Sequence, residues 1–175
     1  ESYKKGNVKQ RGRFNLGEKL ALAMFRSAKI KSTKGTVLFN EDGTRTSSIK
    51  KTTSGTQFIG EIKLTESEMS DIVKRCNDII VPKGVELNVM GNSKFYEIPK
   101  FTFETSLPTI IADEEGNLKN STQKTMVEIY PKSKDKGCIF ELGIPIVDCD
   151  IDYDINVMQK VPLNKDRDNV LPSYR

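Results

Sequence analysis

The chain has 175 residues, of which 36% are hydrophobic and 30% charged, a balance typical of a globular protein of one or two domains. It contains no histidine, which excludes Ser-His and Cys-His catalytic pairs and HExxH zinc sites. Three widely spaced cysteines predict neither a disulfide framework nor a CxxC site, and a reducing cytoplasm is the expected location. No apolar run reaches the roughly 18 residues of a membrane span, and the polar N-terminus predicts no signal peptide.

Positive charge is concentrated near the N-terminus. The net charge is +4, and residues 1–35 alone contain ten Lys or Arg against two Glu. The remainder of the chain is therefore net negative. A basic segment of this kind needs an anionic partner, and the phosphates of a nucleotide or of nucleic acid are the obvious candidates.

The first third of the chain predicts one helix and three strands. Apolar residues spaced by three or four over 16–28 predict a helix of about three turns. A Lys-Gly pair between two short β-branched segments predicts a hairpin turn. The expected strands are 28–33, 36–39 and 55–64.

A second helix has the clearest signal in the sequence. Thr65 and Glu68 form a capping box, in which each side chain satisfies an end N–H of the helix. Apolar residues then recur on one face over 69–80, and Pro82 ends the pattern. A strand is expected at 85–90.

After about residue 92 the pattern becomes mostly β. Short alternating segments separated by turn residues predict four strands there. These strands are expected at 101–107, 125–130, 138–142 and 153–158. The sequence thus predicts an α+β protein with two domains, 1–92 and 93–175.

Two glycines lead into the expected first helix. Gly12 and Gly17 let the backbone approach an anion closely, and the free N–H groups of a helix N-terminus then bind it. Arg11, Arg13 and Lys19 add positive charge around them. The alternative interpretation is an ordinary helix start that contains glycine.

A second segment with chemical potential is 159–170, which is rich in Lys, Asn, Asp and Arg. One cation on such a loop can neutralise the charge that develops in phosphoryl transfer. The alternative is that Arg167 pairs with Asp166 or Asp168 on a surface turn.

The glycine segment resembles the second glycine-rich box of the GHKL ATPases, a superfamily that includes DNA gyrase B, the ninety-kilodalton heat-shock chaperone, sensor histidine kinases and MutL. In the chaperone type this box reads Gly-x-Phe-Gly-x-Gly and ends the lid over the ATP phosphates. Gly12, Phe14, Leu16 and Gly17 match the box, and Asn15 replaces its middle glycine. The resemblance implies these nucleotide-binding residues: Arg11, Gly12, Arg13, Phe14, Asn15, Leu16, Gly17, Lys19 and Thr56.

Thr56 enters this set through the order of the elements. In GHKL proteins a Gly-Thr pair opens a central strand, and the Thr hydroxyl contacts the adenine region. Thr56 follows Gly55 at the start of the expected strand 55–64. Outside this resemblance, Thr56 is an ordinary β-branched strand residue.

The segment 159–170 resembles the Pro-Leu-Asn-x-x-Arg-Glu loop of the chaperone's middle domain, whose Arg reaches the γ-phosphate of ATP. The matching residues are Leu163, Asn164 and Arg167, with Asp168 in place of Glu. Gln159-Lys160 also resembles the Gln-x-Lys loop of gyrase B. By this resemblance Arg167 and Lys160 are catalytic, and Asn164 and Gln159 support the loop.

The resemblance implies ATP binding and hydrolysis coupled to closure or dimerisation, with Mg²⁺. It also implies a fold: the latter half of a GHKL two-layer α/β sandwich over 1–92, including the end of the ATP lid, and the start of a ribosomal-protein-type transducer domain over 93–175. The general-base Glu, the Mg²⁺-binding Asn and the Asp-x-Gly-x-Gly motif of the superfamily have no match ahead of Gly12. We therefore expect part of a longer bacterial or phage ATPase, inactive by itself.

The second hypothesis is a nucleic-acid-binding or purely structural module that uses the basic N-terminal segment without catalysis. No stripe of interleaved basic and aromatic residues supports it. Besides ATP, self-association and DNA are the expected partners, and no membrane is expected.

Overall fold

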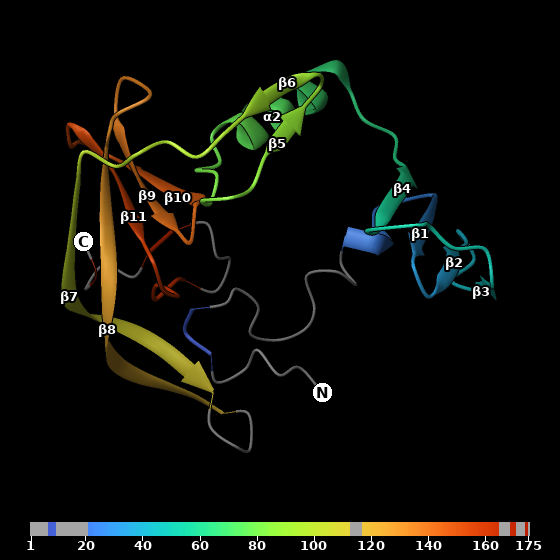
Figure 1. Cartoon of the computed structure of the whole chain (residues 1–175), viewed down its shortest axis with the longest axis horizontal. Coiled ribbons are helices and arrows are strands. Elements are labelled where there is room, and N and C mark those ends of the chain that lie inside the picture. Colours follow the sequence, from blue (N-terminus) through green and yellow to red (C-terminus); the bar gives the residue numbers. More distant parts are fainter. Residues whose placement is uncertain (1–6, 10–20, 113–116, 165–168, 171–173, 175) are drawn as a thin grey trace. The chain divides into compact units, whose positions relative to one another are not determined.

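The computed structural model describes residues 7–9, 21–112, 117–164, 169–170 and 174. The chain forms two compact units, coloured along the sequence in Figure 1. The inserted unit comprises Phe14–Met69, and the main unit comprises Glu1–Arg13 together with Ser70–Arg175. The expected domain boundary near residue 92 falls inside the main unit.

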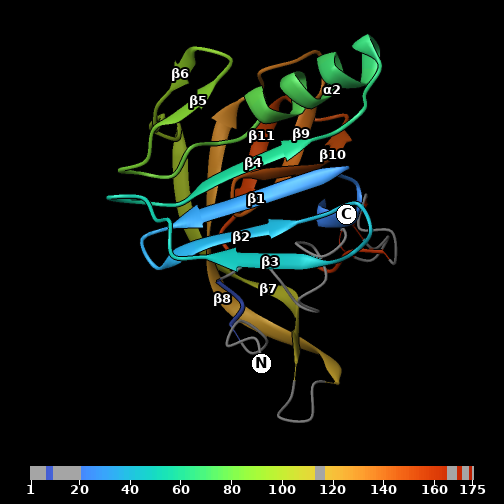
Figure 2. The same cartoon turned by 90° about the vertical axis from the view of Figure 1, so that its right-hand side faces the viewer.

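The inserted unit is built on a four-stranded antiparallel sheet of order β3-β2-β1-β4, which Figure 2 shows face on. Its strands are β1 (Ser27–Ser32), β2 (Gly35–Phe39), β3 (Arg45–Ser48) and β4 (Gln57–Glu61). The predicted hairpin is confirmed, because β1 and β2 pair with Ser32 opposite Gly35. β3 was not predicted, since its polar sequence Arg-Thr-Ser-Ser shows no hydrophobic alternation.

The two faces of this sheet differ sharply in chemistry. One face carries Ala28, which is only 2% exposed, and the edge-to-face pair of Phe25 and Phe58, whose ring centroids are 5.2 Å apart. Phe25 packs directly over Gly60, where an added Cβ would meet the ring at 2.5 Å. Because successive side chains of a strand point to opposite faces, Lys29 lies on the other face.

The capping box is confirmed at the start of α2 (Glu66–Asn77). The Glu68 N–H donates to Thr65 Oγ1 at 3.3 Å, and the Thr65 N–H donates to Glu68 Oε2 at 2.7 Å. These two bonds satisfy end groups that have no partner within the helix. After the helix, the Ile80 N–H donates to the Gly143 carbonyl at 2.9 Å.

The main unit contains a five-stranded sheet of order β10-β9-β11-β8-β7 and a small β5–β6 hairpin. β9 and β11 pair in parallel, and the other neighbours pair antiparallel. A core cluster of Val157, Val161, Leu163 and Val170 packs against the sheet. The strands are β5 (Leu87–Val89), β6 (Asn92–Lys94), β7 (Phe101–Ala112), β8 (Leu118–Pro131), β9 (Gly137–Glu141), β10 (Ile144–Cys149) and β11 (Tyr153–Val157).

The predicted fold class is wrong. The protein is mostly β with antiparallel sheets, not an α+β two-layer sandwich with helices on one face. Among the described residues α2 is the one complete helix, accompanied by a helical turn at 21–23. The expected first helix fails at its C-terminal end, because residues 27 and 28 already pair with β2 and β4. The long β7–β8 hairpin accounts for much of the excess of strand over helix.

Candidate functional site

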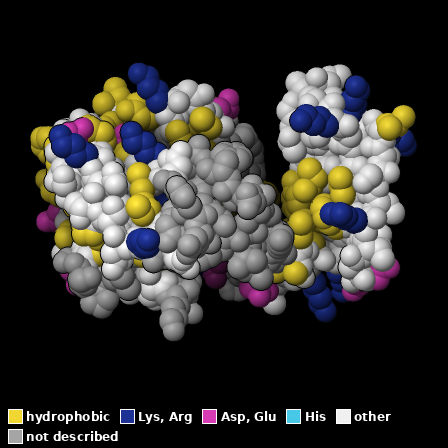
Figure 3. Space-filling model, turned by 90° about the horizontal axis from the view of Figure 1, so that it is seen from below, with side chains coloured by type: hydrophobic (Ala, Val, Ile, Leu, Met, Phe, Trp, Pro, Cys, Tyr) yellow, Lys and Arg dark blue, Asp and Glu magenta, His cyan; other side chains and the backbone are white. Residues whose placement is uncertain are grey.

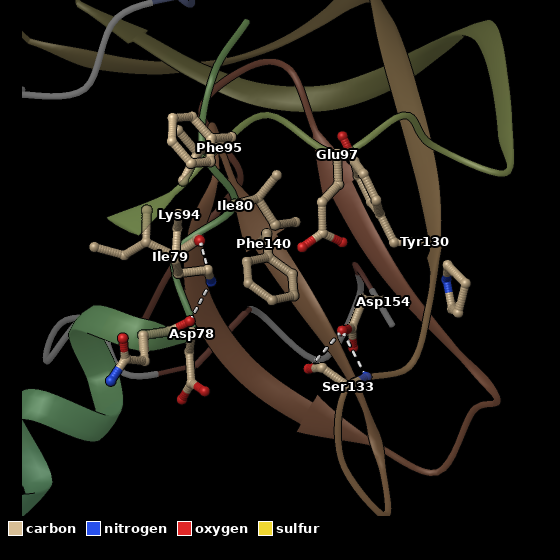
Figure 4. Close-up of a pocket in the computed structure, with 13 residues that line it drawn as sticks. Asp78, Ile79, Ile80, Lys94, Phe95, Glu97, Tyr130, Ser133, Phe140 and Asp154 are labelled. Carbon is tan, nitrogen blue, oxygen red and sulfur yellow. Dashed lines mark hydrogen bonds between the residues drawn. The ribbon is translucent and has the colours of Figure 1, made fainter. Parts of the chain in front are cut away.

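The main unit contains a cavity of about 290 Å³ between the segment 77–81, the β6 region and the sheet, shown in Figure 4. Phe140, which is 2% exposed, lies at its centre, and Glu97 and Tyr130 lie on one side. The Tyr130 hydroxyl donates to Glu128 Oε2 at 3.0 Å. Burial raises the pKa of Tyr130 above its usual range, and the bond to Glu128 raises it further.

The polar groups of this cavity hold neighbouring segments together. Asp154 accepts the backbone N–H and the hydroxyl of Ser133 at 3.2 and 3.0 Å (Figure 4), and its other oxygen accepts the Cys138 N–H at 2.8 Å. The Lys94 ammonium donates to the Ile79 carbonyl at 3.1 Å and also to the carbonyl of Asn77. These bonds join the end of α2 to β6, and β11 to the β8–β9 turn and β9. The cavity is therefore better explained by structure than by ligand recognition.

A more unusual cluster surrounds the loop 158–164, which follows β11. Gln159 and Lys160 are 0% and 1% exposed, although lysine is almost never fully buried unless its ammonium is paired. The Gln159 amide donates to the carbonyl oxygens of Leu107 and Pro108 at 3.1 and 3.4 Å. The Thr109 hydroxyl donates to the Lys160 carbonyl at 2.7 Å. The second half of β7 therefore positions this loop.

The loop also binds a buried carboxylate and the N-terminal segment. Glu141 at the end of β9 is 0% exposed, and its Oε2 accepts the Val161 N–H at 2.9 Å. The Lys160 N–H donates to the Val8 carbonyl at 2.8 Å. Burial, reinforced by the charge of Glu141, raises the pKa of Tyr174 to about 12.

An apolar groove of about 580 Å³ runs along the five-stranded sheet and reaches Tyr174. Phe103 and Val127 line it, as do Ile155 and Val157 from β11. Phe103 is 47% exposed. Most of its lining is apolar, but the charged residues Lys136, Asp148 and Asp150 also line it.

The structure brings together only part of the predicted site. Gln159 and Lys160 are both buried. At the end of the loop, the Asn164 N–H donates to the Asn169 carbonyl at 2.9 Å. Thr56 belongs to the inserted unit, where it is exposed immediately before β4. The remaining predicted residues lie outside the described residues: Arg11, Gly12, Arg13, Phe14, Asn15, Leu16, Gly17, Lys19 and Arg167.

Sequence reasoning missed Glu141, Thr109 and Tyr174. A signal existed for Glu141, because this acidic residue interrupts the apolar run Cys-Ile-Phe-Glu-Leu, and a charge in a buried strand needs a partner. Thr109 and Tyr174 gave no such signal. Each interacts with a residue more than 30 places away in the sequence, Thr109 with Lys160 and Tyr174 with the charge of Glu141.

Comparison of the chain with known protein families, with curated proteins and with solved structures finds no match. Over the part of the chain that the structure describes, no helix has the length and apolar character to cross a membrane. Over the same residues, no three Cys, Asp or Glu side chains gather into a potential metal site. The Mg²⁺ that the resemblance implies is therefore not assigned to any described residue.

Proposed function

We propose that this chain binds ATP and belongs to an enzyme that hydrolyses it, with the loop 158–164 responding to the nucleotide. The observation that carries the proposal is the 2.8 Å hydrogen bond from the Lys160 N–H to the Val8 carbonyl. Val8 lies four residues before Gly12, where the predicted glycine box begins. This bond links the predicted γ-phosphate loop to the segment that leads into the predicted phosphate-binding box.

The burial of Lys160 supports a contact that depends on conformation. At 1% exposure its ammonium cannot meet a phosphate from solvent unless the surrounding side chains move. A cation that reaches the phosphate only in one state contributes to that state and not to initial binding. This fits an ATPase in which nucleotide drives closure or self-association, and the three free cysteines fit a cytoplasmic protein.

Calorimetric titration of residues 1–175 with ATP tests the binding step. The double variant Arg13→Gln/Lys19→Gln removes two cations of the glycine box. Affinity should fall at least about tenfold, since a hydrogen bond to a charged group is worth about 1.5–3 kcal/mol. The matched control is Lys63→Gln/Lys83→Gln, which removes the same charge at two exposed lysines. Absence of saturable ATP binding, or an equal loss in the control, would contradict the proposal.

Arg167→Ala tests the hydrolytic step in the natural protein that carries this chain. Arginine contacts to a transferring phosphoryl group are worth about a thousandfold or more in turnover. Steady-state ATPase activity should therefore fall much more than ATP affinity, and Arg167→Lys should rescue it poorly because an ammonium lacks the planar fork of guanidinium. Unchanged turnover would show that Arg167 is a surface residue paired with Asp166 or Asp168.

A further inference from the structure

The lysine face of the inserted unit is a surface that the proposed function does not use. It is the side of the sheet opposite Ala28 and Phe58, and a hollow of about 350 Å³ lies on it. Lys29, Lys31 and Lys50 line this hollow. Figure 3 shows Lys and Arg side chains in dark blue on the surface of this unit, at the right.

The register of the sheet places Lys29 and Lys31 on the same face. Lys29 lies opposite Leu38, and Lys31 lies opposite Thr36. Two residues along a strand are about 6.6 Å apart, so the two lysines stand side by side on the same face. The Thr36 hydroxyl donates to the Lys50 carbonyl, which ties the backbone of the third lysine to β2.

Within the described part of the unit, these lysines are not neutralised by a carboxylate. Among the described residues, no carboxylate forms an ion pair with Lys29, Lys31 or Lys50, although the lysines Lys132, Lys134 and Lys136 of the main unit each pair with an aspartate. Glu61 lies on the same face at the end of β4, opposite Ser27, and does not line the hollow. Unpaired cations on a rigid sheet favour an anionic partner.

The groups between the lysines indicate which anion fits. Thr46 and Ser48 place hydroxyl groups in the same hollow, and Ser and Thr hydroxyls commonly donate to phosphate oxygens of nucleic acids. Among the described residues, no aromatic ring lines the hollow to stack on the bases of a single strand. Its described lining also includes no Arg, Asn or Gln side chain of the kind that reads base edges.

We propose that the lysine face binds the phosphate backbone of a nucleic-acid duplex without reading its sequence. A membrane surface of anionic lipids fits less well, because interfacial binding needs a large apolar face. The described apolar side chains beside Lys29 on this face are Leu38, which is half-buried, and Ile59. This inference is independent of ATP binding. It concerns a different face and different residues from the loop 158–164.

Fluorescence anisotropy with a labelled 30-base-pair DNA duplex and residues 1–175 tests the proposal between 50 and 200 mM salt. The triple variant Lys29→Gln/Lys31→Gln/Lys50→Gln removes three phosphate contacts. The slope of log affinity against log salt should become shallower by about 2.7, at about 0.9 per contact. Affinity at 50 mM salt should fall at least about tenfold, since three contacts alone account for a roughly 40-fold change over this salt range.

The control triple variant Lys63→Gln/Lys74→Gln/Lys83→Gln removes the same charge at exposed lysines outside the hollow. Circular dichroism verifies that both variants fold. Duplex RNA of the same length identifies which duplex is preferred, and lysine-dependent binding of either supports the proposal. An unchanged salt slope in the lysine-face variant, an equal loss in the control, or lysine-dependent binding to anionic vesicles in place of duplexes would overturn it.

Discussion

The two sheets of this protein place polar side chains in opposite ways. In the main unit, three buried polar residues of the sheet each accept a backbone N–H. Asp154 accepts that of Cys138, Asn156 that of Gly143, and Glu141 that of Val161. In the inserted unit, Lys29 and Lys31 lie on strand β1 but form no ion pair with any described residue.

This difference separates polar residues that hold the fold from those available to a partner. A buried polar group is costly unless it is hydrogen-bonded, so the main-unit residues should matter chiefly for stability. Lys29 and Lys31 are half-buried and form no ion pair with a described residue, so their charges should matter chiefly for binding. Substitution of matched residues in the two units tests this contrast.

The largest effect is expected at Glu141. Glu141→Ala leaves the buried Val161 N–H without its acceptor and should destabilise the main unit by about 3 kcal/mol. Glu61→Ala, at an exposed strand position of the inserted unit, should change stability by less than about 0.5 kcal/mol. Urea unfolding measures both. Similar losses for the two variants would remove the distinction between the sheets.

All five tyrosines lie outside the inserted unit, so tyrosine fluorescence follows the main unit alone. Circular dichroism follows both units. Glu141→Ala should therefore lower the urea midpoint that tyrosine fluorescence reports. A change seen only by circular dichroism would mean that the substitution destabilises the inserted unit, which would contradict the prediction.

The predictable part of the fold is the local part. Ala28, Lys29, Ile30 and Lys31 alternate apolar and charged side chains, which is enough to predict a strand with one polar face. Thr65 and Glu68 are three residues apart, so their capping box could also be read directly. The fold class could not be predicted in this way, because the sheet order depends on pairings such as β9 with β11, which no local pattern specifies.

A smaller effect separates two glycines with nearly the same backbone conformation. Gly143 has φ +82°, and a Cβ there would meet the Ile80 carbonyl oxygen at 2.5 Å, whereas Gly43 has φ +80° and open space around it. Left-handed backbone costs an alanine about 1–2 kcal/mol. Gly43→Ala should cost about 1 kcal/mol, and Gly143→Ala clearly more.

Thermal unfolding of these two glycine variants is the measurement. Equal losses would show that the contact between Gly143 and Ile80 adds nothing to the backbone strain. In that case the close approach of segment 77–81 to the β9–β10 turn would not constrain the main unit.

The smallest expected effect is a dependence on alkaline pH. The pKa of Tyr174 is raised to about 12 by burial and by the charge of Glu141, against about 10 in the unfolded chain. Between these values the unfolded state binds fewer protons than the folded state, so stability falls as pH rises from about 10 toward 12 and is unaffected below. Tyr174→Phe should reduce this fall.

Tyr130 has a pKa raised in the same direction, so Tyr174→Phe should remove only part of the alkaline effect. The inserted unit has no tyrosine, and its unfolding should not show this component. Urea midpoints at pH 9, 10 and 11 measure the difference, and an identical pH profile in Tyr174→Phe would contradict the assignment.

Gln159 and Lys160 are predicted site residues that adjoin in the sequence, and the structure shows that both are buried. Their proposed role stays a prediction. Their burial could not be predicted, because lysine side chains usually lie at the surface. The groups that contact this loop come from β7, β9 and residues 7–9, which are distant in the sequence. The glycine box stays a prediction, since it lies outside the described residues.

The hydrogen bond between Lys160 and Val8 has a topological consequence. This bond joins residues 8 and 160 within the main unit. In the sequence, the inserted unit is therefore flanked on both sides by segments of the main unit. A single protease cut in the inserted unit would then leave two fragments on one folded body. Native mass would stay near 19.7 kDa while a denaturing gel resolved two shorter chains.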